Sequence, residues 1–411
     1  MESIKKSRNQ ETIKSRNIKG LFLLLLLDGF GGGMFVAIYQ PYVLALTGSM
    51  FLTGALSTLG LVLITFPRPF IGRLSDRYGR KKIFAMSTPQ LILGFILFIT
   101  ANNIFILALG VIITNLGSAF GGLGVQMFVS ESSKKKKRGF NFGLTVFGAF
   151  AGGIFGKFFV TFGLFSDLRV YFLIFIVIFC FEWLIQLFVL SNPNQGEDIQ
   201  NNTPNRPKEH SEGIWKKVLT NPKTKAIIIF FTLDGLIYGT SGVLYVAGLR
   251  DYYNLSIPNI AFISMWFNVS SLIFQIPAGH LADRIGKKKS LLLSESLGVG
   301  YFILIISGFI VWNMGFNFLL LIFLIIGEFI MGISASTFIP SEGMTVTDLD
   351  ETGKRKAEAL GIVSLIRGFG FIPTGIIAGF LMEYVNYITP FIITVLGIFV
   401  LIWILLKRFH D

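Results

Sequence analysis

Long apolar blocks separated by short polar segments dominate the sequence. Twelve blocks hold close to 20 or more mostly apolar residues, and ~20 such residues form an α-helix that crosses the hydrocarbon core of a bilayer. The blocks cover residues 20–46, 51–71, 83–101, 104–129, 139–164, 168–191, 225–248, 258–279, 289–311, 315–339, 357–382 and 387–407. The pattern therefore predicts an all-α membrane protein with twelve transmembrane helices.

The same pattern divides the chain into two halves. Residues 20–191 form a predicted six-helix bundle and residues 225–407 form another, with a polar linker at 192–224 and short tails at 1–19 and 408–411. Because the number of spans is even, both termini lie on one side of the membrane. That side carries 31 of the 36 Lys and Arg residues. The positive-inside rule then predicts a multi-pass protein of the cell membrane with cytoplasmic termini and linker.

A short charged sequence occurs once in each half. Residues 72–82 read GRLSDRYGRKK and residues 279–289 read GHLADRIGKKK, which places Asp283 207 positions after Asp76. Asp28 and Asp234 stand in matching Leu-Asp-Gly triplets, 206 positions apart. These offsets predict that a six-helix unit was duplicated and that the two copies have the same orientation in the membrane.

Composition excludes several other classes of protein. With 53% hydrophobic and only 14% charged residues, the chain cannot cover a water-soluble surface. The net charge of +13 sits mostly in short loops, where it reports membrane topology rather than nucleic-acid binding. Cys180 is the only cysteine, and the three histidines are widely spaced, so we expect no disulfide, metal site, cofactor or enzymatic activity.

The twelve spans, the central linker and the repeated charged sequence together resemble the major facilitator superfamily over essentially the whole chain. The first copy matches the motif A of that family, and the second departs only by His280 at a variable position. The resemblance implies a transporter that works by alternating access, with helices 1, 4, 7 and 10 around a central cavity. It assigns a gating role to motif A, which comprises Gly72, Asp76, Arg77, Gly79, Arg80, Gly279, Asp283, Arg284, Gly286 and Lys287.

The acids of motif A have a particular role in the resemblance. Asp76 is expected near the start of helix 11 and Asp283 near the start of helix 5, where the helix dipole favours a carboxylate. These contacts would keep the cytoplasmic side closed, and they would break when that side opens during transport.

Two acids lie deep within predicted spans. Asp28 and Asp234 are nine to ten residues into helices 1 and 7, which corresponds to ~14 Å at ~1.5 Å per residue. A charge at this depth costs ~2.5–3.5 kcal/mol or more, so it needs a function or a partner. The resemblance places both acids across the cavity from each other, where either binds a proton or a cationic group. The alternative is that each accepts only local hydrogen bonds.

Further charged residues fall inside spans. Glu328 and Arg367 lie midway along helices 10 and 11, so we expect an ion pair between them, either as a structural brace or as a proton-sensitive switch. Lys157 lies near the predicted outer end of helix 5, where its amine would reach water.

Helix 5 carries regularly spaced glycines. Gly139, Gly148, Gly152 and Gly156 reproduce most of the spacing of the antiporter signature of the family. Two positions depart from it, since Gly153 replaces its proline and Lys157 its last glycine. Close helix packing through small residues explains the same spacing. Helix 4 lacks the arginine of the family's motif B.

These features favour a proton-coupled exporter of hydrophobic or cationic small molecules, acting as a monomer in the lipid bilayer. One alternative is uptake of a small organic anion or sugar, with Arg367 clamping an anionic group. Another, from a different class, is a membrane sensor or receptor that binds its ligand without moving it.

Overall fold

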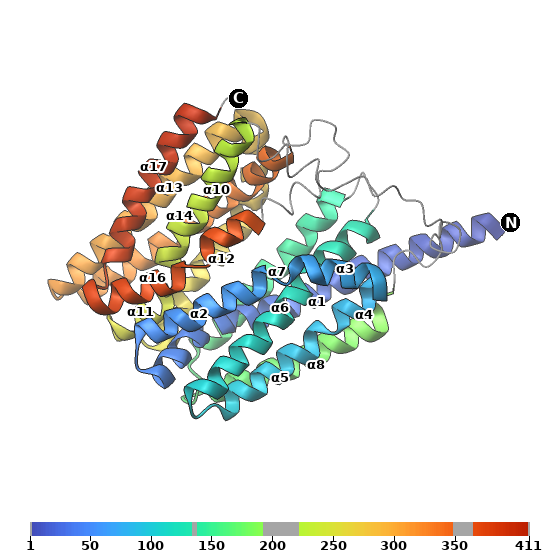
Figure 1. Cartoon of the computed structure of the whole chain (residues 1–411), viewed down its shortest axis with the longest axis horizontal. Helices are drawn as coiled ribbons and strands as arrows, with labels where there is room; N and C mark the ends of the chain where they lie inside the picture. The colour runs from blue at the N-terminus through green and yellow to red at the C-terminus, as the bar shows by residue number, and fades with distance from the viewer. Residues whose placement is uncertain (1, 134–137, 192–221, 348–364, 410–411) are drawn as a thin grey trace. The chain divides into compact units, whose positions relative to one another are not determined.

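The computed structural model describes residues 2–133, 138–191, 222–347 and 365–409. Every regular element within these ranges is a helix (Figure 1). Twelve helical segments are long and apolar enough to cross a membrane, which confirms the predicted number. They run over Thr12–Thr47, Met50–Ser75, Arg80–Thr100, Ile104–Val129, Gly143–Thr161, Arg169–Val189, Lys225–Asp251, Ile257–Ile285, Lys287–Asn313, Asn317–Thr345, Leu365–Val385 and Thr389–Arg408. Most of the predicted linker and the predicted start of helix 11, 357–364, lie outside the described residues.

The chain forms two compact units. The first holds the described parts of Met1–Ile38, Val62–Phe159 and Gly163–Lys208, and the second holds those of Tyr39–Leu61, Val160–Phe162 and Glu209–Asp411. The segment 39–61, predicted as part of the first bundle, therefore packs with the second unit.

The helices of the first half follow one another closely along the chain. They are α1 (Glu2–Thr47), α2 (Met50–Thr65), α3 (Arg68–Tyr78), α4 (Arg80–Ala85), α5 (Ser87–Thr100), α6 (Ile104–Ser132), α7 (Arg138–Thr161) and α8 (Arg169–Leu184), which a π-helical turn, Ile185–Val189, extends. Those of the second half are α10 (Pro222–Gly242), α11 (Tyr245–Asp251), α12 (Ile257–Ile285), α13 (Lys287–Asn313), α14 (Asn317–Thr347), α16 (Thr374–Phe380) with a π-helical turn at Leu381–Val385, and α17 (Thr389–Arg408).

Each charged sequence is helical up to its second glycine. α3 ends at Gly79 with φ +91°, and α12 ends at Gly286 with φ +86°. Residues other than glycine rarely adopt these backbone angles, so the sequence pattern fixes where the chain turns. The first glycines of the two copies, Gly72 and Gly279, lie inside helices, and the space for a methyl group there is open or ordinary.

Glycines bring α1 and α7 together in the first unit. A Cβ atom on Gly152 would lie 2.1 Å from the carbonyl oxygen of Leu26, and one on Gly156 would lie 2.0 Å from that of Phe30. Gly29 of α1 approaches the carbonyl oxygen of Ala149 in the same way, at 2.2 Å. The glycine spacing of helix 5 therefore allows α1 and α7 to pack closely, which was one of the two explanations offered for it from the sequence.

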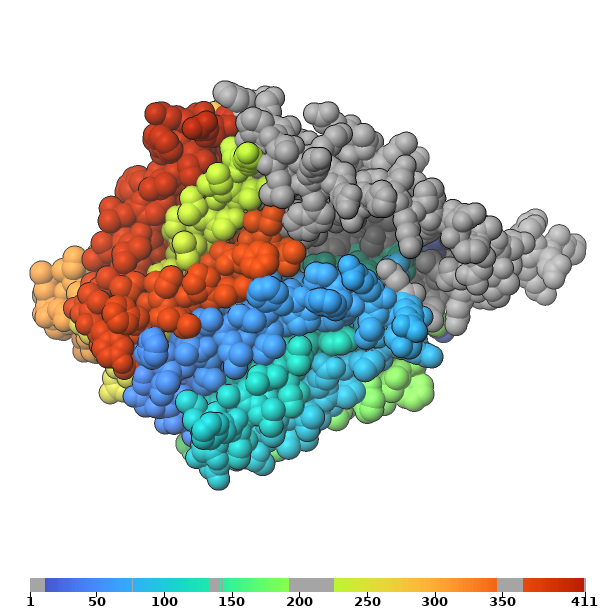
Figure 2. Space-filling view, in the orientation of Figure 1, coloured from blue at the N-terminus to red at the C-terminus, as the bar shows by residue number. Residues whose placement is uncertain are grey.

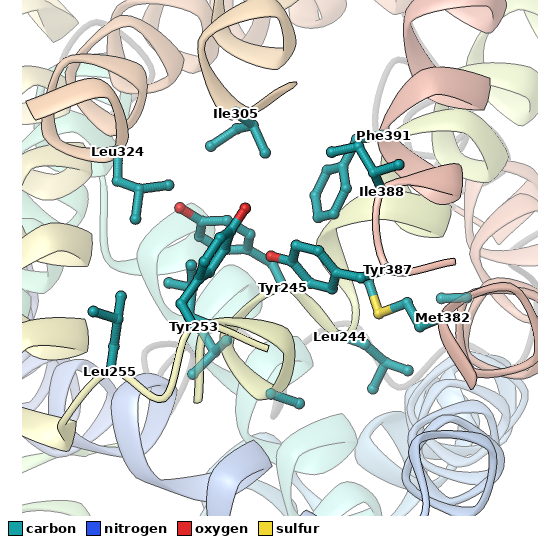
Figure 3. Packing of buried hydrophobic residues seen from close by; sticks show 14 of the residues in the cluster. Leu244, Tyr245, Tyr253, Leu255, Ile305, Leu324, Met382, Tyr387, Ile388 and Phe391 are labelled. Atoms are coloured by element: carbon teal, nitrogen blue, oxygen red, sulfur yellow. The ribbon is translucent and has the colours of Figure 1, made fainter. Parts of the chain in front are cut away.

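A cluster of aromatic side chains fills the second unit at the end where α12 begins. Figure 3 shows the hydroxyls of Tyr245, Tyr253 and Tyr387 pointing toward a common region. The rings of Tyr253 and Tyr387 are 5.3 Å apart and nearly perpendicular, and that of Tyr387 also packs on Phe391. Burial raises the pKa of the Tyr253 and Tyr387 hydroxyls, so both stay neutral.

The start of α2 packs against α16 and the π-helical turn that follows it, in the same unit (Figure 2). Cβ atoms on Gly54 and Gly375 would each lie within 2.3 Å of the other residue's carbonyl oxygen. Glu383 accepts hydrogen bonds from Ser49 Oγ at 2.6 Å and from Phe51 N at 2.7 Å. The carboxylate therefore satisfies a backbone group left open at the first turn of α2.

A side chain from α1 interrupts the seventh span between α10 and α11. In a continuous helix the N–H of Ala247 would donate to the carbonyl of Val243. Gln40 lies between them instead: its Oε1 accepts from Ala247 N at 3.0 Å, and its Nε2 donates to Val243 O. Insertion of a side chain into the helical hydrogen-bond ladder is a known cause of a break.

The glycine contact of α7 leads to the first prediction. Gly152→Ala is expected to lower the free energy of unfolding by about 1–3 kcal/mol, because α1 and α7 must separate to admit the methyl group. Gly143→Ala on the same helix is the matched control, since nothing lies within 4 Å of its Cβ position. Unfolding of both variants in one detergent measures the difference, and equal stabilities would contradict the packing.

Candidate functional site

An arginine joins two acids inside the second unit. Arg367, in the helical segment 365–371, places Nη2 2.7 Å and Nε 3.0 Å from Asp234 Oδ2. Its Nη1 donates to both carboxylate oxygens of Glu342 at 3.2 Å. The side chain of Asp234 is only 2% exposed, against 26% for Arg367 and 20% for Glu342. A buried carboxylate and a partly accessible arginine–glutamate pair therefore form one ionic cluster.

Glycines explain why the segment that carries Arg367 lies so close to α10, which carries Asp234. A Cβ atom on Gly370 would lie 2.1 Å from the carbonyl oxygen of Thr232, and one on Gly235 would lie 2.8 Å from that of Arg367. Both glycines let the segment 365–371 touch α10 along its backbone. Gly235 directly follows Asp234, so the repeated Leu-Asp-Gly triplet supplies the acid and also the room for its partner.

Two aromatic rings cover the guanidinium of Arg367. Its Cζ atom lies 4.8 Å from the ring centroid of Phe338 and 5.6 Å from that of Phe371. Both distances fall within the range of a cation–π interaction. The rings replace water around the charged group and leave its edge for the two carboxylates.

A third acid of this cluster was absent from our sequence predictions. Glu295 on α13 is fully buried, accepts a hydrogen bond from Tyr238 Oη at 3.0 Å, and lies within electrostatic range of Asp234 and Arg367. Its Oε1 has no hydrogen-bond partner in the described part of the chain. The rule that singled out Asp234, a charge inside a predicted span, applies equally to Glu295.

The expected pair of Glu328 with Arg367 is corrected by the structure. Arg367 bonds to Asp234 and Glu342, while Glu328 is buried on α14 and accepts from Tyr301 Oη at 3.4 Å. Position along two helices gives the depth of a side chain but not the direction in which it points. Glu328 therefore belongs to the tyrosine-rich end of the unit rather than to the ionic cluster.

The first unit has its own acids within the spans. Asp28 on α1 is exposed, whereas Glu182 on α8 is 3% exposed, has Asp28 as a charged neighbour, and has an unpartnered Oε1 among the described residues. Lys157 is 4% exposed, so our expectation that its amine reaches water is wrong. Asp28 and Asp234 belong to different units, and their placement across a cavity stays a prediction.

The basic residues of the charged sequences hold helix ends within their own units. Lys81 Nζ donates to the carbonyl of Leu187 at 2.6 Å, and the repeat-related Lys288 Nζ donates to that of Phe409 at 2.7 Å. Cations are favoured at the carboxyl ends of helices, where carbonyl groups lack helical partners. The side chain of Asp76 lies outside the described part of the chain, and the gating roles of motif A stay predictions.

The two repeats use a related glutamate differently. In the first unit Arg80 forms an ion pair with Glu131 at the end of α6. Glu342 in the second unit follows a serine, as Glu131 does, 211 positions later in the sequence, and pairs with Arg367. The related glutamates therefore have different partners, and Glu342 of the second unit is the one that belongs to the ionic cluster. Arg77, Asp283 and Arg284 are exposed.

A metal centre is not apparent in the described residues. No group of three His, Cys, Asp or Glu side chains there lies close enough to hold a metal ion. The cluster around Arg367 instead offers titratable oxygens, a fixed cation and aromatic faces. Such groups bind protons and organic ions.

Comparison with known proteins gives a family match and several relatives. The model of the Major Facilitator Superfamily matches residues 21–247 and 227–411. The chain is 21% identical to the tetracycline resistance protein, class E, of Escherichia coli over 306 residues, covering 72% of this chain and 75% of that protein. It is 30% identical to the multidrug resistance protein MdtG of Proteus mirabilis over 280 residues, covering 64% of this chain and 65% of that protein.

Solved structures show the same fold. The nucleoside transporter NupG superposes with a TM-score of 0.75 at 16% identity, covering 96% of this chain and 99% of that one. A bacterial homologue of the lysosomal transporter Spinster superposes with a TM-score of 0.71 at 12% identity, covering 97% and 99%. At these identities the likeness concerns the arrangement of helices alone.

The ionic cluster leads to the second prediction. Asp234→Ala is expected to lower the free energy of unfolding by about 3 kcal/mol, because it leaves a partly buried guanidinium with one carboxylate in place of two. Adding Arg367→Leu is expected to restore most of the loss. Unfolding in detergent would compare both with Asp251→Ala, which removes an exposed acid of α11. Equal effects of Asp234→Ala and Asp251→Ala would contradict the pairing.

Proposed function

The chain belongs to the Major Facilitator Superfamily, and from that premise we propose that it is a proton-coupled exporter of hydrophobic or cationic small molecules. Small-molecule transport follows from the family, whereas the direction, the coupling ion and the kind of substrate are our proposal. We place the protein in the cell membrane with cytoplasmic termini, because most Lys and Arg residues fall on that side of the predicted spans.

The observation that carries the proposal is the sharing of Arg367 between Asp234 and Glu342. A protonated carboxyl group no longer attracts a guanidinium as a charge, so uptake of a proton by Asp234 weakens its hold on Arg367. Release of the proton restores the pair. Proton binding thereby weakens a contact between two spanning segments, and proton release restores it. A proton-coupled transporter needs such a link between its proton and its conformation.

Competition between protons and cations supports exchange of one for the other. A proton and a cationic substrate both neutralise carboxylates, so each excludes the other from the same acid. Two binding events that exclude each other lower each other's affinity by an equal factor. Such antagonism favours antiport, in which the proton enters as the substrate leaves.

The surroundings of the cluster support a hydrophobic or cationic substrate. Phe338 and Phe371 offer aromatic faces beside the acids, and aromatic faces with carboxylates attract organic cations. The relatives named for resistance to tetracycline and to multiple drugs point to the same class of compounds.

The alternative functions have less support. An anionic substrate at Arg367 would compete with two internal carboxylates, because Nε, Nη1 and Nη2 each bond to one of them. A sensor that binds without transport has no need for two copies of a gating sequence, and the chain retains both.

Reconstitution into liposomes provides the test and the third prediction. With an imposed pH gradient, the protein is expected to move ethidium, a hydrophobic cation, against a counterflow of protons that an internal pH dye records. Asp234→Asn is expected to reduce coupled transport at least tenfold (roughly 1.4 kcal/mol or more of lost coupling). Asp251→Asn, an exposed acid of the same unit, is expected to leave the rate unchanged.

Two results would overturn the proposal. One is transport that leaves the internal pH constant while the dye moves. The other is full coupled activity in Asp234→Asn. Inhibition by Asp251→Asn would show instead that removal of any acid from this unit disturbs the protein.

A further inference from the structure

Arg367 sits in a box whose chemistry is that of a receptor for organic cations. We call the four side chains around its guanidinium the cation box: the carboxylates of Asp234 and Glu342 and the rings of Phe338 and Phe371. Carboxylates attract a cation and aromatic faces shield it from competing water. The guanidinium thus occupies the position that a bound organic cation would take.

The box has more carboxyl groups than cationic groups. Asp234, Glu342 and the adjacent Glu295 supply three carboxyl groups, against one guanidinium. The Oε1 atom of Glu295 is buried and has no partner within the described residues. In a medium of low polarity such an excess requires further positive charge, from protons or from a bound cation.

One side of the box is accessible from outside, and the helix that carries Arg367 has a proline close to it. The helical segment 365–371 is interrupted at Ile372 and Pro373 before α16 begins. Proline lacks an N–H group, so Pro373 cannot donate to the helical hydrogen-bond ladder at this point. Arg367 and Glu342 are 26% and 20% exposed, which makes their side of the box accessible.

We propose that Arg367 is an internal stand-in for the substrate, and that an organic cation binds in the cation box by displacing it. This inference rests on the proposed function, which it deepens by naming the binding side chains and the occupant that must leave. Displacement also accounts for the two aromatic faces, which an ion pair alone does not require. The arginine keeps the acids neutralised while the box holds no substrate.

The fourth prediction tests this displacement by equilibrium dialysis of the purified protein in detergent, at pH 8 and without any gradient. The probe is tetraphenylphosphonium, a rigid hydrophobic cation. Arg367→Gln is expected to tighten its binding about tenfold, because an internal competitor has been removed. Arg408→Gln, an exposed arginine of the same unit, is the matched control and is expected to bind as the unmodified protein does.

The walls of the box are tested in the same assay. Asp234→Asn and Phe371→Leu are each expected to weaken binding of the probe, the latter about threefold to thirtyfold through loss of a cation–π interaction. Tetraphenylborate has nearly the same shape and the opposite charge. It is expected to bind no better to Arg367→Gln than to the unmodified protein.

A measurement on the unmodified protein avoids any dependence on the folding of variants. Phenylglyoxal reacts with accessible guanidinium groups, and peptide mass spectrometry reports the modification of each arginine. Tetraphenylphosphonium is expected to speed the modification of Arg367 and to leave that of Arg408 constant. Unchanged or slower modification of Arg367 would overturn the displacement, as would equal or weaker binding of the probe by folded Arg367→Gln.

The two proposals fail in different experiments. Binding that follows these expectations, together with liposomes that move no protons, would remove the proton-coupled exporter and keep the cation box. Coupled export of ethidium by the unmodified protein, with Arg367 unaffected by the probe, would do the reverse.

Discussion

A charge inside a membrane-spanning bundle must have partners, and the second unit is arranged around this constraint. Arg367 meets it with two carboxylates along its edge and two phenyl rings over its faces. Glycines at 235 and 370 let the backbone segments approach closely enough for these contacts. Removing either carboxylate would leave the guanidinium with one charged partner in place of two, and the glycines are what allow both to reach it.

Duplication of a six-helix unit explains both the similarity and the difference between the halves. Lys81 and Lys288 hold equivalent helix ends, and Gly79 and Gly286 end equivalent helices with similar backbone angles. The related acids at 131 and 342 have diverged, since one pairs with an arginine of the charged sequence and the other with Arg367. Both copies thus share the contacts at the helix ends, while the ionic cluster around Arg367 lies in the second unit.

Much of the fold was predictable because its signals are local. Apolar length gave all twelve spans, because each span is one continuous stretch of the chain. The depth of Asp234 was also predictable, because it needs only a count along one helix. The partner of Arg367 was not, because pairing depends on how each helix is rotated and which face it turns to its neighbour. The predicted pair with Glu328 failed for this reason.

Burial was harder to predict than position. Glu295 lies inside the predicted span 289–311, only six residues after three consecutive lysines, and its position gave no sign that α13 buries it completely. Lys157 lies near the predicted end of a helix, which led us to expect that its amine reaches water. The structure buries the side chain instead. In both cases the packing of other helices decides the environment, and a single stretch of sequence does not contain that information.

The Gln40 insertion gives the seventh span two ways to satisfy the same backbone groups. With the amide in place, α1 supplies a donor to Val243 and an acceptor to Ala247. In a continuous α-helix the same N–H and carbonyl groups would bond each other. The seventh span therefore cannot form a continuous helix at this point while the Gln40 amide stays in place, so the side chain of α1 and the shape of this span are coupled through two backbone groups.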